Sequence, residues 1–316
     1  MNKIIACPVN GFVNRMRNMA SCYAVSCILG KSFEIMWNHS EDHPKYQLKD
    51  NQHPCGLDFN QFVESHPQSS LKVNDLDFNF QKLRGTGKKI VETEDRIFIQ
   101  FNEHKYLDLI ADSQKDVVVV GGGHLLKAGK GKSVYDPSII SENSNSIINP
   151  YHYISGVCSF YKFFPSKNWI QDIIYNKASL CKRALGVQIR VGDFMNAPHS
   201  PWFGKNLTED DVINIFKKHI DQQLLTGKFE SIYITSDSLY VLNKIQNDYK
   251  GKVFFFPKNE IKRDCHRGVV DAYIDWQLLS YCPYILYTKF SSFGAESCFR
   301  IGIDYQNKYF TPVGYE

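Results

Sequence analysis

The eight residues Gly186–Asp193, with the sequence GVQIRVGD, combine residue types that can bind a phosphate. Apolar and polar residues alternate along this segment until Gly192, and a period of two is typical of a strand. Gln188 and Arg190 then leave the strand by one face near its carboxyl end, where ligands of open α/β sheets bind. The planar fork of an arginine donates two parallel hydrogen bonds to a phosphate. The segment therefore predicts a phosphate site. The alternative is an ion pair between Arg190 and Asp193 or a neighbouring carboxylate.

Residues 10–17 (NGFVNRMR) form a second polar junction, at the start of an expected helix. The turn at Gly11 leaves unpaired backbone N–H groups at the helix start, and such groups attract an anion. Asn14, Arg15 and Arg17 add side-chain donors. This junction predicts an anion site, with a plain helix cap as the alternative. It lacks the full G-x-G-x-x-G spacing, so a dinucleotide fingerprint and an NAD-dependent oxidoreductase are not supported.

Two more junctions place hydroxyl groups after an expected strand. Residues 235–238 (TSDS) hold Asp237 between serines, and residues 289–294 (KFSSFG) hold Ser291 and Ser292 before a helix. Serine hydroxyls and helix N-terminal N–H groups together suit a phosphate. Helix capping is the alternative at each junction. Because four such junctions occur in one chain, a functional role for these residues is favoured over four unrelated helix caps.

The elements expected around the first junction are a strand at 3–7, a helix and a strand at 32–37. Apolar residues recur at i, i+3, i+4 and i+7 along the helix, as one buried face requires, and Gly30 stands where a helix C-terminal glycine is expected. That face consists of Met16, Met19, Ala20, Tyr23, Ala24, Cys27 and Ile28. Residues 38–115 are polar and irregular, and a strand at 117–120 ends in Gly121–Gly123. The order of these elements predicts a Rossmann-like unit.

A second regular series begins after a Ser-, Asn- and Pro-rich stretch at 136–150. Strands are expected at 185–191, 231–235, 252–256 and 284–288. Helices are expected from Thr208 to about 225, where Thr208 and Asp211 suggest a capping box, and at 238–249, 269–281 and 294–301. Strands that alternate with helices predict a parallel sheet, and we expect the domain boundary near 160–180.

Composition narrows the class of protein. A chain of 316 residues is longer than one small core usually organises, so two domains are expected. The net charge of +4, with no Lys/Arg block longer than three residues, does not favour nucleic acid. No apolar run approaches the ~18 residues that span a bilayer, and no signal-peptide core is present. We therefore expect a cytoplasmic protein, or a soluble fragment, without a membrane segment.

No metal site is predicted. The nine cysteines form no C-x-x-C pair and are odd in number, which indicates free thiols. No H-x-H pair occurs among the histidines. Asp75 and Asp77 have the D-x-D spacing of some metal-dependent glycosyltransferases, but they lack the strand-then-turn setting of such a site.

Taken in order, the junctions resemble the fucosyltransferase superfamily, which includes α-1,6-, α-1,2- and protein O-fucosyltransferases. GVQIRVGD is similar to the family's H-V-R-R-G-D motif, and the loop at residues 10–17 is similar to its G-x-G-N-x loop. Residues 275–280 (DWQLLS), 284–288 and 290–292 (FSS) resemble the D-x-x-x-L-S … T-x-S-S segment of the α-1,6 branch.

The resemblance implies an α/β protein of GT-B architecture, with two Rossmann-like domains whose parallel sheets face a central cleft. Residues 1–165 would form the N-terminal, acceptor-side domain, and residues 166–316 the domain that binds the nucleotide sugar. The implied reaction is an inverting transfer of fucose from GDP-fucose to a hydroxyl of a glycan or glycoconjugate. It would need no metal ion or other cofactor, so the implied partners are GDP-fucose and a carbohydrate acceptor.

The same resemblance implies roles for single residues. Arg190 would hold the β-phosphate and stabilise the departing GDP, and Asp275 would pair with the guanine edge. Ser291 and Ser292 would contact the pyrophosphate, and Phe293 would line the nucleotide.

Asn14 would reach the phosphates or the acceptor, and Asp193 and Asp237 would lie beside the nucleotide. The expected catalytic set is therefore Arg190, Asp193 and Asn14. The expected donor-binding set is Gly11, Asn14, Arg15, Gln188, Arg190, Asp237, Asp275, Ser291, Ser292 and Phe293.

Two departures from the family pattern leave the general base open. Gln188 stands where the family has a histidine, and residues 197–199 (APH) stand where the α-1,6 branch has an acidic residue. The base is Asp193, His199, a first-domain carboxylate such as Glu103, or no side chain. The alternatives to fucosyl transfer are transfer from another GDP-sugar, such as GDP-mannose, and a relative that binds nucleotide or glycan without catalysis.

Overall fold

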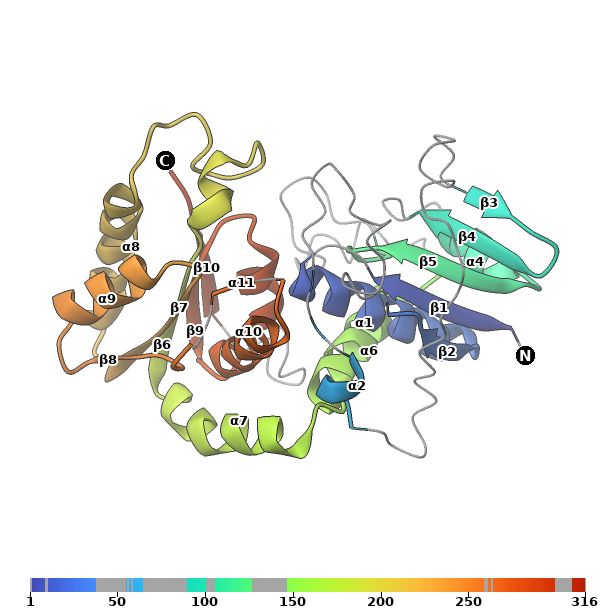
Figure 1. Cartoon of the computed structure of the whole chain (residues 1–316), viewed down its shortest axis with the longest axis horizontal. Coiled ribbons are helices and arrows are strands. Elements are labelled where there is room, and N and C mark those ends of the chain that lie inside the picture. The colour runs from blue at the N-terminus through green and yellow to red at the C-terminus, as the bar shows by residue number, and fades with distance from the viewer. Residues whose placement is uncertain are drawn as a thin grey trace. The chain divides into compact units, whose positions relative to one another are not determined.

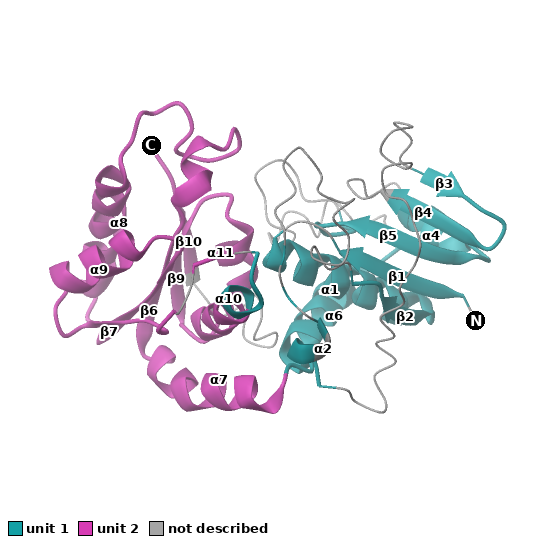
Figure 2. Ribbon diagram, in the orientation of Figure 1, with its two compact units in different colours: residues 1–166, 263–269 teal, residues 167–262, 270–316 magenta. Residues whose placement is uncertain are grey.

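The computed structural model describes residues 2–8, 11–37, 55, 57, 59–64, 90–100, 106–126, 147–258, 261–262, 264–298 and 309–315. The chain divides into two compact units, each with its own β-sheet (Figure 2). Unit 1 comprises residues 1–166 and 263–269, and unit 2 comprises residues 167–262 and 270–316.

The sheet of unit 1 has the strand order β2-β1-β5-β4-β3 (Figure 1). Its strands are β1 (Lys3–Pro8), β2 (Ser32–Ile35), β3 (Ile90–Glu92), β4 (Arg96–Gln100) and β5 (Asp116–Gly121). All neighbouring pairs are parallel except β3 and β4, which are antiparallel. The carboxyl ends of β1 and β5 consequently lie at the same edge of the sheet.

The described helices of unit 1 are α1 (Phe12–Leu29), α2 (Phe59–Phe62), α4 (Leu107–Asp112) and α6 (Pro150–Phe163). Helix α1 follows β1 and ends at Gly30, whose φ of 63° is the left-handed conformation expected of a C-terminal glycine. It packs closely on α6, because a Cβ atom at Gly156 would lie 2.8 Å from the Cβ atom of Ala24. The predicted apolar face is buried at Met16, Met19, Ala20 and Ala24, whereas Cys27, near the helix end, is exposed.

The sheet of unit 2 is parallel throughout and has the order β10-β9-β6-β7-β8. Its strands are β6 (Ala184–Ile189), β7 (Ser231–Ser236), β8 (Val253–Phe254), β9 (Tyr284–Thr288) and β10 (Tyr309–Val313). The parallel sheet of unit 2 and the mainly parallel sheet of unit 1 confirm the α/β fold class that the sequence predicts.

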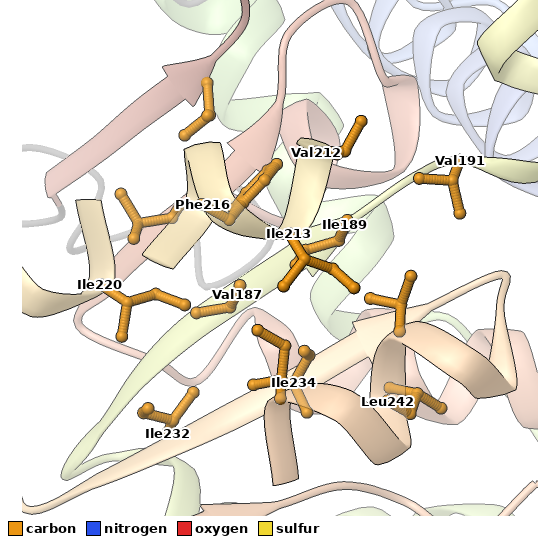
Figure 3. Packing of buried hydrophobic residues seen from close by; sticks show 14 of the residues in the cluster. Val187, Ile189, Val191, Val212, Ile213, Phe216, Ile220, Ile232, Ile234 and Leu242 are labelled. Carbon is orange, nitrogen blue, oxygen red and sulfur yellow. The ribbon is translucent and has the colours of Figure 1, made fainter. Parts of the chain in front are cut away.

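One face of the unit 2 sheet is covered by α8 (Glu209–Leu224) and α9 (Leu239–Asp248). The apolar residues of β6 and β7 that alternate with polar ones point into this cluster (Figure 3). The cluster includes Val187, Ile189, Ile232, Ile234, Phe216, Ile220 and Leu242. Because neighbouring residues of a strand face opposite sides, Gln188 and Thr235 are turned to the other face.

The predicted capping box at the start of α8 is present. The Thr208 hydroxyl accepts a hydrogen bond from the Asp211 backbone N–H, and the Asp211 carboxylate accepts one from the Thr208 backbone N–H. That backbone hydrogen bond and a second one from the Thr208 hydroxyl lower the pKa of Asp211. The carboxylate therefore stays ionised at the positive end of the helix, where it is stabilising.

The remaining elements of unit 2 are α7 (Asn168–Cys181), the short 3-10 helix η3 (Gly192–Asn196), α10 (His266–Leu279) and α11 (Ser292–Ser297). The structure assigns the first residues of α10 to unit 1 and the rest to unit 2. Gly186 of β6 permits a close approach of the end of α10, because a Cβ atom there would lie 2.9 Å from the Cδ1 atom of Leu279. This helix therefore covers the polar-bearing face of β6 and β7.

Some sequence expectations about elements are wrong. The expected strand at 252–256 is only the two-residue β8, and the described part of 38–115, expected to be irregular, contains α2, β3, β4 and α4. Strand β10 and helices α6 and α7 were not anticipated. Pro312 lies inside β10, and a proline usually argues against a strand except at a sheet edge, which is where β10 lies.

Two further expectations concern cysteines and the membrane. All nine cysteines are free thiols, and most of them are buried, as predicted. Among the helices of the described ranges, none is both long and apolar enough to cross a membrane.

Candidate functional site

The backbone of Arg190 is fixed at the carboxyl end of β6 by side chains from two other segments. The Arg190 N–H donates to the Thr288 hydroxyl at the end of β9 over 2.8 Å. The Arg190 carbonyl accepts from the indole N–H of Trp202 over 3.0 Å. The residue is thus held in place independently of its side chain.

The guanidinium group of Arg190 lies against an aromatic ring and near two carboxylates. Its Cζ atom is 4.6 Å from the centroid of the Phe194 ring, a cation–π arrangement. Nη2 lies 3.7 Å from Asp193 Oδ1, and Nε lies 4.0 Å from Asp237 Oδ2. Both separations exceed the ~3.2 Å of a good hydrogen bond, and the side chain is 20% exposed. The ion pair with Asp193 therefore exists but is loose.

Asp237 connects the ends of β6 and β7. Its Oδ1 atom accepts a hydrogen bond from the backbone N–H of Val191 over 2.9 Å. Gly192 allows this approach, because its φ of 40° is a left-handed conformation and a Cβ atom there would lie 3.0 Å from Asp237 Oδ2. The expected junctions at residues 186–193 and 235–238 are therefore brought together.

Two buried polar atoms at the same edge of the sheet have no hydrogen-bond partner among the described residues. They are Oε1 of Gln188, on β6, and the hydroxyl oxygen of Ser291, just after β9. Both residues are buried, and β6 and β9 are neighbours in the sheet. A buried polar atom without a partner is costly, so these atoms indicate where a ligand could bind: Gln188 Oε1 can accept a hydrogen bond, and the Ser291 hydroxyl can donate or accept one. Ser292 and Phe293 follow in α11 and are half-buried.

Asp275 occupies a different environment from the one that its expected role requires. Its side chain is 0% exposed. Oδ1 accepts from the Tyr233 hydroxyl over 2.6 Å, and Oδ2 accepts from the Thr235 hydroxyl over 2.7 Å. Oδ2 also lies 2.7 Å from the ammonium group of Lys258. The geometry does not support direct pairing of Asp275 with a guanine, because the carboxylate is enclosed and already engaged.

In the first junction, Arg15 also differs from expectation. It is 6% exposed, its Nη1 donates to the Pro8 carbonyl over 3.1 Å, and its Cζ lies 4.9 Å from the Trp37 ring centroid. Burial lowers its pKa. These contacts make Arg15 a structural residue, and its predicted contact with the donor is not supported. Gly11 is the N-terminal cap residue of α1 and, as a glycine, has no side chain that could accept from the first backbone N–H groups of the helix. Asn14 is half-buried.

The candidates for a general base divide between described and undescribed parts of the chain. Asp193 is 46% exposed, and His199 is exposed with its ring centroid 5.3 Å from that of Phe194. Glu103 lies outside the described residues, as do Asp75 and Asp77 of the D-x-D pattern.

Two groups of buried polar residues were not predicted from the sequence. Lys258, after β8, belongs to the buried cluster around Asp275. In unit 1, the buried Tyr153 hydroxyl contacts the Ser21 hydroxyl, the Leu125 N–H and Nδ1 of His124. The helix that carries Tyr153 begins with Asn149 as its cap and Pro150 at its first position. That pair is a usual helix-start signal, and it could have revealed α6.

No protein-family model and no curated protein matches the sequence. The structure, however, is similar to solved fucosyltransferases. NodZ α-1,6-fucosyltransferase soaked with GDP-fucose has a TM-score of 0.56 at 14% identity, over 95% of this chain and 92% of that chain. Fucosyltransferase NodZ from Bradyrhizobium has a TM-score of 0.52 at 15% identity, over 94% and 92%.

A third similar structure is a variant of Arabidopsis thaliana FUT1 in complex with GDP. It has a TM-score of 0.56 at 12% identity, over 95% of this chain and 68% of that chain. At these identities the shared property is the fold. The chain therefore has a fold similar to that of these proteins, which confirms the GT-B fold class that the motif resemblance implied.

Proposed function

We propose that this protein is a glycosyltransferase that moves fucose from GDP-fucose to a carbohydrate hydroxyl, with inversion and without a metal ion. The observation that carries the proposal is Arg190, an anchored and partly exposed arginine at the carboxyl edge of a parallel sheet. This edge is where ligands of such sheets bind. One of the similar solved structures was soaked with GDP-fucose and another is a complex with GDP, which supports a GDP-sugar as the donor.

In the proposed reaction, the acceptor oxygen attacks the anomeric carbon of fucose. The bond from that carbon to the β-phosphate oxygen breaks on the opposite side, and GDP leaves with the electron pair. The configuration inverts because attack and departure occur on opposite faces. A general base would take the proton of the acceptor hydroxyl. Of the candidates for this base, Asp193 and His199 lie in the part of the chain that the structure describes.

Arg190 would act on the leaving group. Negative charge grows on the β-phosphate as the bond breaks, and a fixed guanidinium stabilises that charge without having to reorganise. The Thr288 and Trp202 contacts to its backbone, together with the Phe194 ring, provide this fixed position. A guanidinium in this role would perform the charge stabilisation that a metal ion performs in metal-dependent transferases.

Gln188 and Ser291 would complete the donor site. The buried Gln188 Oε1 would accept a hydrogen bond from an N–H or O–H group of the nucleotide sugar, and the Ser291 hydroxyl would donate to an oxygen of the pyrophosphate. Asp237 would hold the Val191 amide and stand beside Arg190 rather than bind the nucleotide itself.

The first test is a thermal-shift titration with GDP, GDP-fucose, GDP-mannose and UDP. GDP and GDP-fucose should raise the melting temperature and UDP should not, because a ligand that binds only the native state stabilises it by about 2.7 kcal/mol at a hundredfold excess over Kd. Equal shifts with UDP would contradict a GDP-sugar site. A larger effect of GDP-mannose than of GDP-fucose would favour the alternative donor.

A second test separates an enzyme from a relative that only binds. Many transferases slowly hydrolyse their donor when no acceptor is present, so GDP released from GDP-fucose can be followed by chromatography. Release above the rate in buffer supports catalysis. Binding of GDP-fucose with no release, also in the presence of candidate oligosaccharides, would indicate an inactive binding protein.

A further inference from the structure

Lys258 is a buried cation that neither the motifs nor the proposed reaction uses. Its side chain is 8% exposed. Its ammonium group lies 2.7 Å from Asp275 Oδ2, 2.6 Å from the Ser236 carbonyl oxygen and 3.3 Å from the Thr235 hydroxyl. An ammonium group has three N–H donors, so each of them has an acceptor here. A buried charge needs such complete pairing to be tolerated.

The anion of this pair is equally enclosed. Asp275 accepts from Tyr233, Thr235 and Lys258 and is completely buried. Burial first, and then the neighbouring carboxylate, raise the pKa of Tyr233 well above its ordinary value. The Tyr233 hydroxyl therefore stays protonated and keeps donating to Asp275. The cluster of Tyr233, Thr235, Lys258 and Asp275 is a closed unit that joins α10 to the carboxyl end of β7.

The contact from Lys258 to the Ser236 carbonyl connects this cluster to Arg190. Ser236 is the last residue of β7, and Asp237 follows it directly. Asp237 in turn binds the Val191 N–H and lies 4.0 Å from the Arg190 guanidinium. The packing here is tight, because a Cβ atom at Gly192 would lie 3.0 Å from Asp237 Oδ2. A displacement of the β7 end would therefore displace Asp237 and the groups that it holds.

We infer that Lys258 and Asp275 are positioning residues for Arg190. Their buried ion pair fixes the end of β7, and Asp237 transmits that position to the segment that carries Arg190 through its hydrogen bond to the Val191 N–H. This role rests on the proposed function of Arg190. Asp275 then controls turnover through Arg190 and does not select the nucleotide base.

The experiment compares Lys258→Met, Thr235→Val and Asp275→Asn with the control Lys217→Met. Lys217 also has a carboxylate partner at 2.7 Å, Asp248, but it lies on α8 and away from the cluster. Three quantities are measured: kcat and KM for GDP-fucose hydrolysis, the ratio of GDP to UDP affinity, and the Nε–H NMR signal of Arg190 in protein with ¹⁵N-labelled arginine. Arg190→Lys identifies that signal by removing it.

We expect Lys258→Met and Thr235→Val to shift the Arg190 signal and to lower kcat by roughly 10- to 100-fold, the scale of a misplaced catalytic group. KM should change little, and Asp275→Asn should keep the wild-type preference for GDP over UDP. The control should show neither effect. If Lys258→Met does not fold, Thr235→Val, which preserves side-chain volume and both charges, decides the matter.

Two results would overturn the inference. The first is an unchanged Arg190 signal in a folded Thr235→Val or Lys258→Met protein. The second is loss of the GDP preference in Asp275→Asn, which would return Asp275 to the guanine. If wild-type protein binds neither nucleotide, the proposed function fails, but the NMR comparison still tests the coupling of the cluster to Arg190.

Discussion

Arg15 and Arg190 each follow a parallel strand near its carboxyl end, one in each unit, yet their environments differ. Arg15 is 6% exposed, bonded to the Pro8 carbonyl and packed on Trp37. Arg190 is 20% exposed, and its two carboxylate neighbours lie at 3.7 Å and 4.0 Å. The Arg15 guanidinium is enclosed by its contacts, whereas the Arg190 guanidinium is partly exposed against Phe194 and the Arg190 backbone is bonded to Thr288 and Trp202.

This difference shows what separates a structural arginine from a candidate catalytic one. Both arginines fit the same sequence pattern, a strand end followed by polar residues and a helix. What distinguishes them is how far the fold encloses the guanidinium group. In Arg190 the N–H and carbonyl groups are bonded to Thr288 and Trp202, so that the guanidinium is positioned without being enclosed.

The largest expected effect follows from changing Arg190. Arg190→Ala and Arg190→Lys should both lower turnover of GDP-fucose by ~10²-fold or more, the scale of one lost transition-state donor. Lysine keeps the charge but loses the two-pronged geometry. Turnover and melting temperature are measured on both variants. An ion pair with Asp193 as the main role would instead leave the lysine variant active and make the alanine variant mainly less stable.

Replacing Arg15 in unit 1 tests the other half of the comparison between the two arginines. Arg15→Met keeps most of the side-chain length but leaves the buried Pro8 carbonyl without this donor, which should cost about 1–3 kcal/mol of unfolding free energy. Denaturant unfolding measures this loss. Turnover of the folded variant should stay within about twofold of wild type, because one unsatisfied buried acceptor affects stability and not the reacting groups. A stable but inactive Arg15→Met protein would return Arg15 to the donor site.

The smallest expected effect is that of a chelator. If a guanidinium supplies the charge stabilisation, EDTA should leave the rate of GDP release unchanged within error. Magnesium or manganese added after EDTA should not raise it. Loss of activity in EDTA and its recovery with manganese would contradict the proposed chemistry at Arg190.

The local parts of this fold could be predicted from sequence, and the contacts between distant segments could not. Strand β9 has the expected bounds of 284–288, and the capping box of Thr208 and Asp211 is present, since both depend on neighbouring residues. Strand β10 was missed because Pro312 interrupts its pattern. A sheet edge tolerates such a residue, but the edge position is a property of the assembled sheet.

The candidate site divides in the same way. The motif pattern brought attention to Arg190, Asp237 and Ser291, which the structure places at one edge of the unit 2 sheet. It could not reveal that Asp275 is enclosed, because its partners come from β7 and from the segment after β8. Nor could the pattern tell that Arg15 is buried, since Trp37 is contributed by a different segment.

The central claim is that Arg190 binds the β-phosphate, and calorimetric titration with GDP and GMP tests it most directly, because the two ligands differ only in that phosphate. Wild-type protein should prefer GDP. Arg190→Ala should reduce the GDP-to-GMP affinity ratio by about tenfold or more, as expected for a hydrogen bond between charged groups worth about 1.5–3 kcal/mol, whereas Arg15→Met should leave the ratio unchanged. A ratio in Arg190→Ala equal to that of the wild type would contradict the account.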